Sequence, residues 1–512
     1  MATTKRVPSK VQAAQIGRAS DLYINREDSQ TRWNDVITQA GELPSLRSLH
    51  LSRQFFQQTP SSRLVVKAPN LEHLCVDCYA TVSAPALRSI KFTNIPPNFP
   101  QLLKATLNSC SELEDVDIVA PECNSVMTWK GTYACLPDSK IQSLNLTFCG
   151  WNAFPRLSAI VLPHLARLTT NVPARIISSV LTDLSVEGEI QDVLVMLRGM
   201  LALETLHIGS RTFTKALREV THLIVLPRCH TIHYRGLLDA CLVKLLENVT
   251  VPRLSYLQLH SDMDALRNGG SYGAAIEGHG PSPGVGFEAH VRDLGKISSS
   301  LQTIASAPAH LSITCKRDSP ASFTEFQFAV QDAFAKAQAK PGLCVSATTV
   351  EGAHDQPRSV FSHMLQLCAW GSIATVELSL LPPTPAAEGY LCTDPLHAED
   401  EGNRALLAQN LMRMTGVQSL TVNLAKATSD QGLALLRSLS GLQGAWPRLE
   451  RVCIRRPHEE CTSLVHDSNS RSQWLDELHI LVRRRQVVCF ADNGETVEVT
   501  LQCQLFGKGI KS

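Results

Sequence analysis

Apolar residues recur in this chain as a short phrase, at its first, fourth and sixth positions, with polar residues between them. The phrase first appears as Leu46-Leu49-Leu51 and occurs ten times before residue 260, with central positions 16 to 28 residues apart. Those central residues are Leu49, Leu74, Ile90, Val116, Leu144, Leu168, Leu184, Leu206, Ile232 and Leu257. A repeat of this length predicts one strand and one return segment per turn of a solenoid, as in leucine-rich repeats.

The returns between these strands carry helical signals, most clearly over residues 193–200 and 238–249. A proline phrase such as Ala68-Pro69-Asn70 precedes many copies, and we expect its proline to end a helix before the strand. A doubly wound sheet also alternates strands and helices, but it would not repeat one short phrase so often with such short returns. The predicted fold is therefore α/β, a leucine-rich-repeat-like solenoid (horseshoe). It is irregular because only Cys149 matches the Asn or Cys usual at the ninth position.

The regular repeat ends after His260. Residues 268–286 are rich in Gly, Ser and Pro, which is typical of a surface loop or linker. Near the end, Asp492-Asn493-Gly494 separates two apolar runs and predicts a β-hairpin that caps the last turn. Strand-like runs lie between these features, at His310–Cys315, Leu343–Thr348, Ala374–Leu380, Val417–Val422 and Leu449–Ile454.

Four segments follow from these patterns. They are a basic N-terminal segment with a short helix at 1–40, the solenoid at 41–262, a loop or linker at 263–300, and an irregular continuation of the repeats with a C-terminal cap at 301–512. The complete prediction is a solenoid with a C-terminal α/β extension that ends in a β-hairpin.

The composition limits which cellular compartments and which classes of partner are expected. The 512 residues carry a formal net charge of +1, so neither nucleic acid nor a membrane surface is an expected partner. No apolar run reaches the roughly 18 to 20 residues that span a bilayer. The 16 cysteines are scattered singly, which favours a reducing compartment. The first residues lack the apolar core of a secretory signal, while a transit peptide stays open, so we expect a cytoplasmic or nuclear protein.

Two motifs have the spelling of catalytic or metal-binding sites. Residues 269–273 spell G-x-S-x-G around Ser271, but a nucleophile elbow needs a strand before it and a helix after it, and neither is predicted there. Cys75 and Cys78 have C-x-x-C spacing, yet they fall on a predicted strand without a second pair at zinc-finger spacing. We therefore expect no catalytic residue, no metal and no cofactor.

The polar positions between the fourth and sixth residues of the phrase form a candidate binding surface. Because side chains alternate along a strand, these positions point away from the core. The candidate binding residues are His50, Lys91, Asp117, Asn145, His207, His233 and Gln258, with His230 close by and with Cys75, Thr169 and Ser185 in the same series. Their mixed charge suits a protein ligand better than a polyanion.

Histidines are the most distinctive members of this surface. His207 and His233 occupy the same place in consecutive copies, with backbones expected roughly 4.8 Å apart, and His230 lies nearby in sequence. This spacing leaves a zinc or pH-sensing site open. Solvated surface histidines are the simpler interpretation, and we predict no metal ligands.

The repeat phrases, the helix-containing returns and Arg32-Trp33 before the first copy together resemble F-box/leucine-rich-repeat proteins of mushroom-forming fungi. The resemblance covers residues 30–460 and is one of repeat style. It implies repeats that hold a substrate, joined to an F-box that docks the Skp adaptor of a cullin ubiquitin ligase. The F-box phrase L-P-x-E is absent from residues 1–46, so the Skp adaptor is an expected partner only if an F-box lies upstream.

Three functions remain open from the sequence. The first is a substrate receptor of a cullin-type ubiquitin ligase, or a descendant that has lost its F-box. The second is a ligase-independent repeat scaffold, and the third is a serine hydrolase that uses Ser271. We favour a non-catalytic protein-protein interaction module related to the first.

Overall fold

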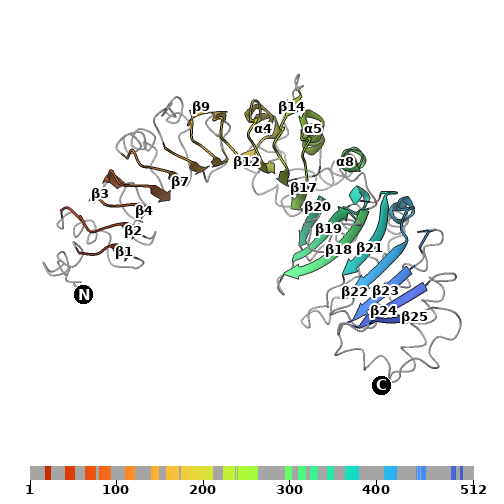
Figure 1. The fold of residues 1–512 in the computed structure, drawn as a ribbon. Coiled ribbons are helices and arrows are strands. Elements are labelled where there is room, and N and C mark those ends of the chain that lie inside the picture. Colours follow the sequence, from red (N-terminus) through yellow and green to blue (C-terminus); the bar gives the residue numbers. More distant parts are fainter. Residues whose placement is uncertain are drawn as a thin grey trace, which may run out of the picture. The chain divides into compact units, whose positions relative to one another are not determined.

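A computed structural model gives the structure of the chain, and its elements are labelled in Figure 1. It describes residues 18–24, 41–51, 64–76, 80–93, 110–120, 140–148, 157–171, 174–210, 223–236, 238, 240–262, 294–302, 309–318, 323–332, 343–350, 364–368, 370–379, 409–423, 446, 448–449, 451–456, 486–491 and 496–499. The fold is α/β, with a large and mostly parallel sheet and few helices in this part of the chain. The chain forms two compact units, here called the first unit (residues 1–231 and 248–253) and the second unit (232–247 and 254–512).

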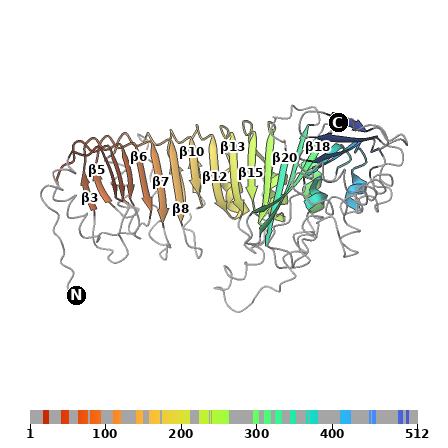
Figure 2. The ribbon, with the colours of Figure 1, turned by 90° about the horizontal axis from the view of Figure 1, so that it is seen from below.

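Short parallel strands stacked side by side in chain order build the first unit (Figure 2). They are β1 (Asp21–Ile24), β2 (Ser48–Leu51), β4 (His73–Val76), β6 (Ser89–Thr93), β7 (Asp115–Ala120), β8 (Ser143–Phe148), β10 (Arg167–Thr170), β12 (Asp183–Gly188) and β13 (Thr205–Ser210). Each strand pairs with the next in a register that aligns the central apolar residues from Leu49 to Leu206. The strand at each repeat phrase of this unit is thereby confirmed.

The core of the first unit lies behind one face of these strands. The central residues from Leu49 to Leu206 are at most 7% exposed. The first residues of the phrase, such as Leu46 and Leu71, are fully buried beside them. Burial of one such side chain contributes roughly 1.5–3 kcal/mol, so the repeated leucines supply the main stabilising free energy of the stack.

A β-turn leads into most of these strands, and its hydrogen bond is the same in each copy that has it. The N–H of Leu71 donates to the carbonyl of Ala68 at 3.0 Å, and Leu87 repeats the bond to Ala84 at 3.0 Å. Pro69 thus occupies the second position of a four-residue turn, where its fixed φ is favourable and its missing N–H costs nothing. Both ends of the turn are buried, which explains the apolar residue on either side of the proline phrase.

The expectation that these prolines end helices is wrong at Pro69, Pro85 and Pro163, each of which follows a strand. Short strands precede the proline turns, because the chain returns along the opposite side of the stack in extended form and pairs there with the next return. The return strands are β3 (Leu64–Lys67), β5 (Ala80–Ser83), β9 (Leu157–Val161), β11 (Ala174–Ile177), β14 (Ile224–Val225) and β16 (Val249–Thr250), paired as β3 with β5, β9 with β11 and β14 with β16. The helical returns predicted at 193–200 and 238–249 are confirmed as α4 (Ile190–Met196) and α5 (Ala240–Asn248).

One carbonyl at the start of each strand holds the next strand in place. The carbonyl of Arg47 accepts two successive N–H groups, from Glu72 at 2.8 Å and His73 at 3.0 Å. The carbonyl of Ser20 accepts the N–H groups of Arg47 and Ser48 in the same way. This shared carbonyl recurs at Glu72, Arg88, Glu114, Gln142, Ala166, Thr182 and Glu204. Because it is a backbone contact, it sets the register whatever side chains the strand carries.

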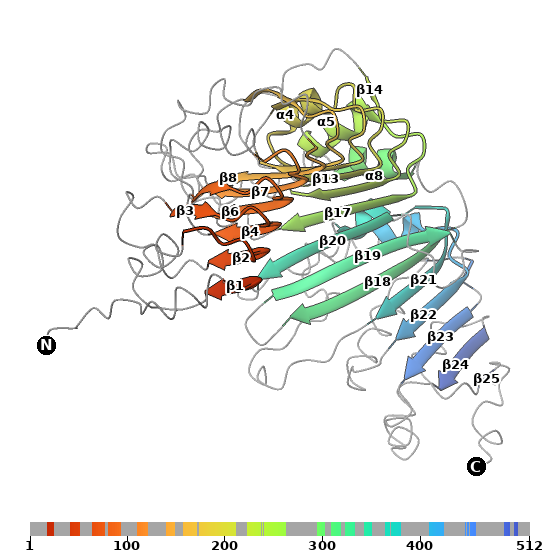
Figure 3. The ribbon, with the colours of Figure 1, turned by 60° about the vertical axis from the view of Figure 1, so that its left-hand side comes forward.

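The second unit contains β15 (Thr231–Arg235), β17 (Tyr256–Asp262) and α8 (Leu294–Gln302), and then a sheet whose order differs from the chain order (Figure 3). Its further strands are β18 (Ala309–Asp318), β19 (Phe323–Asp332), β20 (Leu343–Val350), β21 (Ile373–Ser379), β22 (Ser419–Asn423), β23 (Arg451–Arg456), β24 (Gln486–Ala491) and β25 (Thr496–Val499). β20 pairs with β17, β19 with β20, and β18 with β19, so these three strands are inserted in reverse order before β21. The order of the strands in this sheet therefore differs from their order in the chain.

All five strands predicted in the second half are present, and so are the two strands of the terminal hairpin, which pair antiparallel. The sequence analysis missed β19 and α8 in the second unit, and β1 and the six return strands in the first unit. α8 begins at Leu294, within the segment 263–300 that was predicted as a loop or linker. Residues 268–286 and the turn at Asp492-Asn493-Gly494 lie outside the described residues.

Close packing at Gly416 gives a test of the second unit. A Cβ at Gly416 would clash with the carbonyl oxygen of Gly371 and would lie 3.0 Å from that of Ile373. We expect Gly416→Ala to lower the free energy of unfolding by about 1–3 kcal/mol, because backbone must move. At Gly371 the nearest atom to a Cβ is the side-chain oxygen of Thr415, at 3.4 Å, so Gly371→Ala is the matched control. Equal urea midpoints for the two variants would contradict the packing.

Candidate functional site

The predicted binding positions of the first unit form a continuous row across its strands, here called the outward row. The register aligns His50, Cys75, Lys91, Asp117, Asn145, Thr169, Ser185 and His207. Every member is exposed or half-buried, whereas the residue before it in the chain is buried. The structure thus brings these side chains together on the face opposite the core, and their role in binding stays a prediction.

Polar contacts fix the side chains at the middle of the outward row. Lys91 Nζ lies 2.6 Å from Asp117 Oδ2, and the side-chain amide of Asn145 donates to Asp117 Oδ1 at 2.8 Å. The hydroxyl of Thr147 donates in turn to Asn145 Oδ1 at 2.7 Å. Both oxygens of Asp117 are therefore occupied, and three neighbouring strands present one hydrogen-bonded line.

These contacts orient the side chains more than they stabilise the fold. The side chains of Lys91 and Asp117 are 48% and 29% exposed, and ion pairs at such positions contribute about 0–1 kcal/mol. A ligand therefore meets side chains that already hold one conformation, so less rotamer entropy is lost when it binds.

Further ion pairs connect non-adjacent strands and turns near this line. Arg167 on β10 reaches across β8 to Asp115 on β7, with 3.6 Å between Nη2 and Oδ1. Lys140 Nζ lies 2.7 Å from Glu112, and this hydrogen bond holds the pKa of the Glu112 carboxyl below its ordinary value. Charges of both signs near this line therefore form pairs within the unit.

The predicted histidines lie in different units. His207 belongs to the outward row, and His230 in the same unit is exposed, with Nδ1 2.9 Å from the hydroxyl of Thr231. His233 lies on β15 in the second unit, where Nδ1 is 2.7 Å from Oε1 of Gln258 on β17. No group of three or more His, Cys, Asp or Glu side chains is placed to hold a metal ion in the part of the chain that the structure describes.

Gln258 anchors a second polar cluster, within the second unit. Its Oε1 also accepts the hydroxyl of Tyr256 at 3.4 Å, and the Tyr256 ring meets His233 edge-on, with 5.4 Å between the ring centroids. Burial raises the pKa of Tyr256, so its hydroxyl stays protonated as the donor. The predicted pair His233 and Gln258 is thus brought together with an aromatic residue that the sequence analysis did not name.

Cysteine chemistry differs between the outward row and buried positions. Cys75 lies half-buried in the outward row, and its C-x-x-C partner Cys78 lies outside the described residues, as does Ser271. Burial raises the pKa of the Cys229 thiol to about 11 and also raises that of Cys368. Because the thiolate is the nucleophile, the buried pair is chemically inert at neutral pH.

Tyr23 is a surface residue that the sequence analysis missed. It lies on β1, in register with His50, and its ring stacks on the His50 imidazole with 5.8 Å between centroids and 28° between planes. Its side chain is 65% exposed. The sequence signal for its strand was weak, because Ala19 stands at the first position of the repeat phrase, where the other copies carry a larger apolar residue. Only Leu22 and Ile24 match the phrase.

Comparison with known proteins found no family model that matches the chain and no curated protein that matches it. Within the described ranges, no helix is long and apolar enough to cross a membrane. What the outward row does must therefore follow from its own geometry and charge.

The contrast between the cysteines predicts selective alkylation. In the folded protein at pH 8, we expect iodoacetamide to modify Cys75 at least about tenfold faster than Cys229 or Cys368, since both are buried and protonated. Peptide mass spectrometry of timed samples measures each site separately. In 6 M urea the three rates should converge, and rapid labelling of Cys229 in the folded state would contradict its burial.

Proposed function

We propose that this chain is a non-catalytic protein-binding module, and that its ligand docks on the outward row of the first unit. The observation that carries the proposal is the in-register row itself, with Lys91, Asp117 and Asn145 already joined at its centre. We also propose that the first unit is an irregular leucine-rich-repeat-like solenoid. The recurring turn, the shared carbonyl and the buried central leucines support this fold.

Charge supports a protein ligand over nucleic acid. A phosphate backbone draws several unpaired Lys or Arg side chains onto one face. Lys91 is the one Lys or Arg of the outward row, and Asp117 neutralises it at 2.6 Å. Hydroxyl, imidazole and amide groups at Thr169, His207 and Asn145 offer both donors and acceptors, as protein surfaces require.

The backbone that carries the outward row holds its side chains in a fixed arrangement, which favours binding of a ligand with a complementary shape. Every strand of the row is held by a shared carbonyl at its start and by a buried apolar residue at its centre. Side chains on such strands lose little freedom when a ligand binds, and this raises affinity without additional contacts.

The repeat style relates this module to the substrate-recognition subunits of cullin-type ubiquitin ligases, which work in the cytoplasm or the nucleus. The alternative is a scaffold that binds its ligand without a ligase. Purified full-length chain and Skp adaptor distinguish the two. Binding at micromolar concentration supports the ligase relationship, whereas no binding up to about 100 μM leaves the scaffold.

Substitutions in the outward row test the binding surface. A photoreactive amino acid at Thr169 should cross-link the ligand in the cells of origin, and the purified ligand can then be titrated. We expect the triple variant Lys91→Ala, Thr169→Ala and His207→Ala to weaken binding at least about tenfold, which corresponds to about 1.4 kcal/mol.

The matched control removes three exposed side chains elsewhere on the same unit, with Val195→Ala, Arg198→Ala and Leu223→Ala. It should leave the affinity within about twofold. Circular dichroism of both triple variants checks that the fold is kept. If the control weakens binding as strongly as the outward-row variant, the ligand docks elsewhere.

A further inference from the structure

Among the described strands of the first unit, β1 is the outermost, and its first backbone donors have no acceptor among the described residues. In the following copies, two successive N–H groups at the start of the strand bond one carbonyl of the strand before, as Arg47 and Ser48 bond Ser20. The equivalent N–H groups of β1 belong to Ser20 and Asp21, because Asp21 is in register with Ser48. No carbonyl accepts them within the described residues.

One edge of β1 also has no paired strand among the described residues. β2 pairs with one edge of β1, and no other strand is in register with β1 in the described part of the chain. An edge with unpaired donors and acceptors is a template for an added strand.

Tyr23 supplies an aromatic surface at this edge. One face of its ring stacks on His50, and the side chain is the most exposed of the large apolar residues in the described ranges, at 65%. Since His50 covers it from the β2 side, the remaining face points along the sheet to where an added strand would lie.

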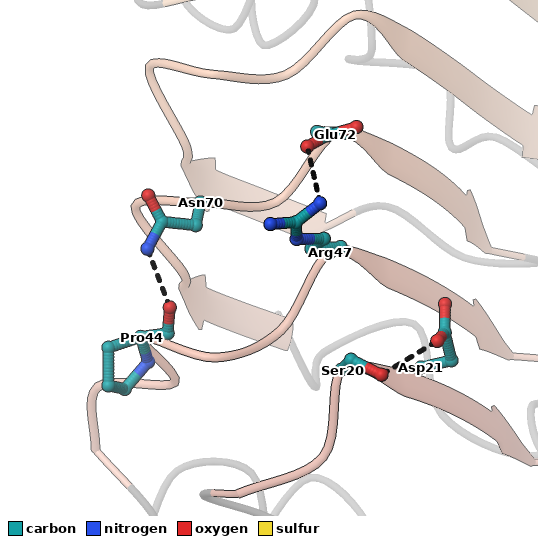
Figure 4. Close-up of polar contacts among 6 residues, drawn as sticks. All are labelled: Ser20, Asp21, Pro44, Arg47, Asn70 and Glu72. Carbon is teal, nitrogen blue, oxygen red and sulfur yellow. Dashed lines mark hydrogen bonds and ion pairs between the residues drawn. The ribbon is translucent and has the colours of Figure 1, made fainter.

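Asp21 supplies a carboxylate on the same face as Tyr23, two residues earlier on β1. Its Oδ2 accepts the hydroxyl of Ser20 at 2.8 Å, and no cation pairs with it in the described ranges (Figure 4). The acid Glu72 does have a cation, since it lies 3.9 Å from Arg47 (Figure 4). Asp115 and Asp117, further along the first unit, are also paired. The next position outward from β1 is a place from which a partner's cation would reach Asp21.

We propose that β1 is a docking edge for an extended, arginine-bearing segment of a partner protein, which adds to the sheet as a further strand. The proposal deepens the proposed protein-binding function, on which it rests, by naming the chemistry of one part of the ligand. A carbonyl of the segment accepts the N–H groups of Ser20 and Asp21. Its arginine lies over the open face of Tyr23 and pairs with Asp21.

The spacing of strands fits one arginine to both groups. Neighbouring strands lie about 4.7–4.9 Å apart, so a residue opposite Tyr23 on an added strand lies at the distance that His50 occupies on the other side. A guanidinium is planar, stacks on aromatic rings and forms two parallel hydrogen bonds to a carboxylate. Residues two apart on a strand lie about 7 Å apart, which the length of an arginine side chain spans.

A synthetic peptide tests this edge before the partner is identified. The probe is the acetylated, amidated and fluorescein-labelled peptide Thr-Val-Thr-Arg-Thr-Val-Thr, titrated with the full chain by fluorescence anisotropy. We expect saturable binding, about threefold weaker for a peptide with Leu in place of Arg. N-methylation of alternate backbone amides should abolish binding if the peptide adds as a strand.

Protein variants locate the bound peptide. Asp21→Asn and Tyr23→Leu should each weaken the Arg peptide about threefold, and the double variant about tenfold. Tyr23→Phe keeps the ring and should change the affinity less than about twofold. Both residues are exposed, so the fold should persist, and circular dichroism checks this.

The proposal is overturned if the Arg and Leu peptides bind equally, if neither binds at 1 mM, or if the double variant binds as well as the original chain. Failure of the docking edge and failure of the wider binding function give different results. A ligand that depends on Lys91, Thr169 and His207 but not on Asp21 and Tyr23 overturns only the docking edge. A ligand that binds the outward-row triple variant as well as the original chain overturns the proposed site of the wider function.

Discussion

The shared carbonyl at the start of each strand is the contact on which the first unit depends. Each one accepts two N–H groups from the next strand, as at Arg47, and so fixes the register before any side chain is considered. With the register fixed, Leu49 meets Leu74 on one face and His50 meets Cys75 on the other. A slip of one residue would exchange the two faces and place leucines in water. The core and the outward row are therefore consequences of the same backbone contact.

The sequence predicted the parts of the fold that large apolar residues mark. The leucines at 49, 74, 184 and 206 recur on the period of the stack, so their strands and their burial could be foreseen. β1 escaped because Ala19 is small. β19 alternates buried Phe328 and Val330 with less buried residues, a signal that was present and was overlooked.

Other features depend on contacts between distant residues. The reversed order of β18, β19 and β20 is a matter of pairing, which hydrophobic alternation along one strand does not encode. The role of Pro69 was misassigned because proline suits both the end of a helix and the second position of a turn. For the candidate site, alternation predicted which residues face outward. It could not predict that Asp117 joins Lys91 to Asn145, since these side chains come from copies 26 and 28 residues apart.

In a stack of similar copies, the end strand differs chemically from the strands inside the stack. Inside the stack, the first N–H groups of each strand bond a carbonyl of the strand before, and a carbonyl of the same strand accepts N–H groups of the strand after. These backbone groups are therefore all hydrogen-bonded. Side chains follow the same rule, because Asp117 and Glu72 find cations on neighbouring copies. In the part of the chain that the structure describes, this supply of partners stops at β1, where the N–H groups of Ser20 and Asp21, the Asp21 carboxylate and the Tyr23 ring lie together on one strand. The binding groups of that strand are available because of its position in the stack as much as because of its residues.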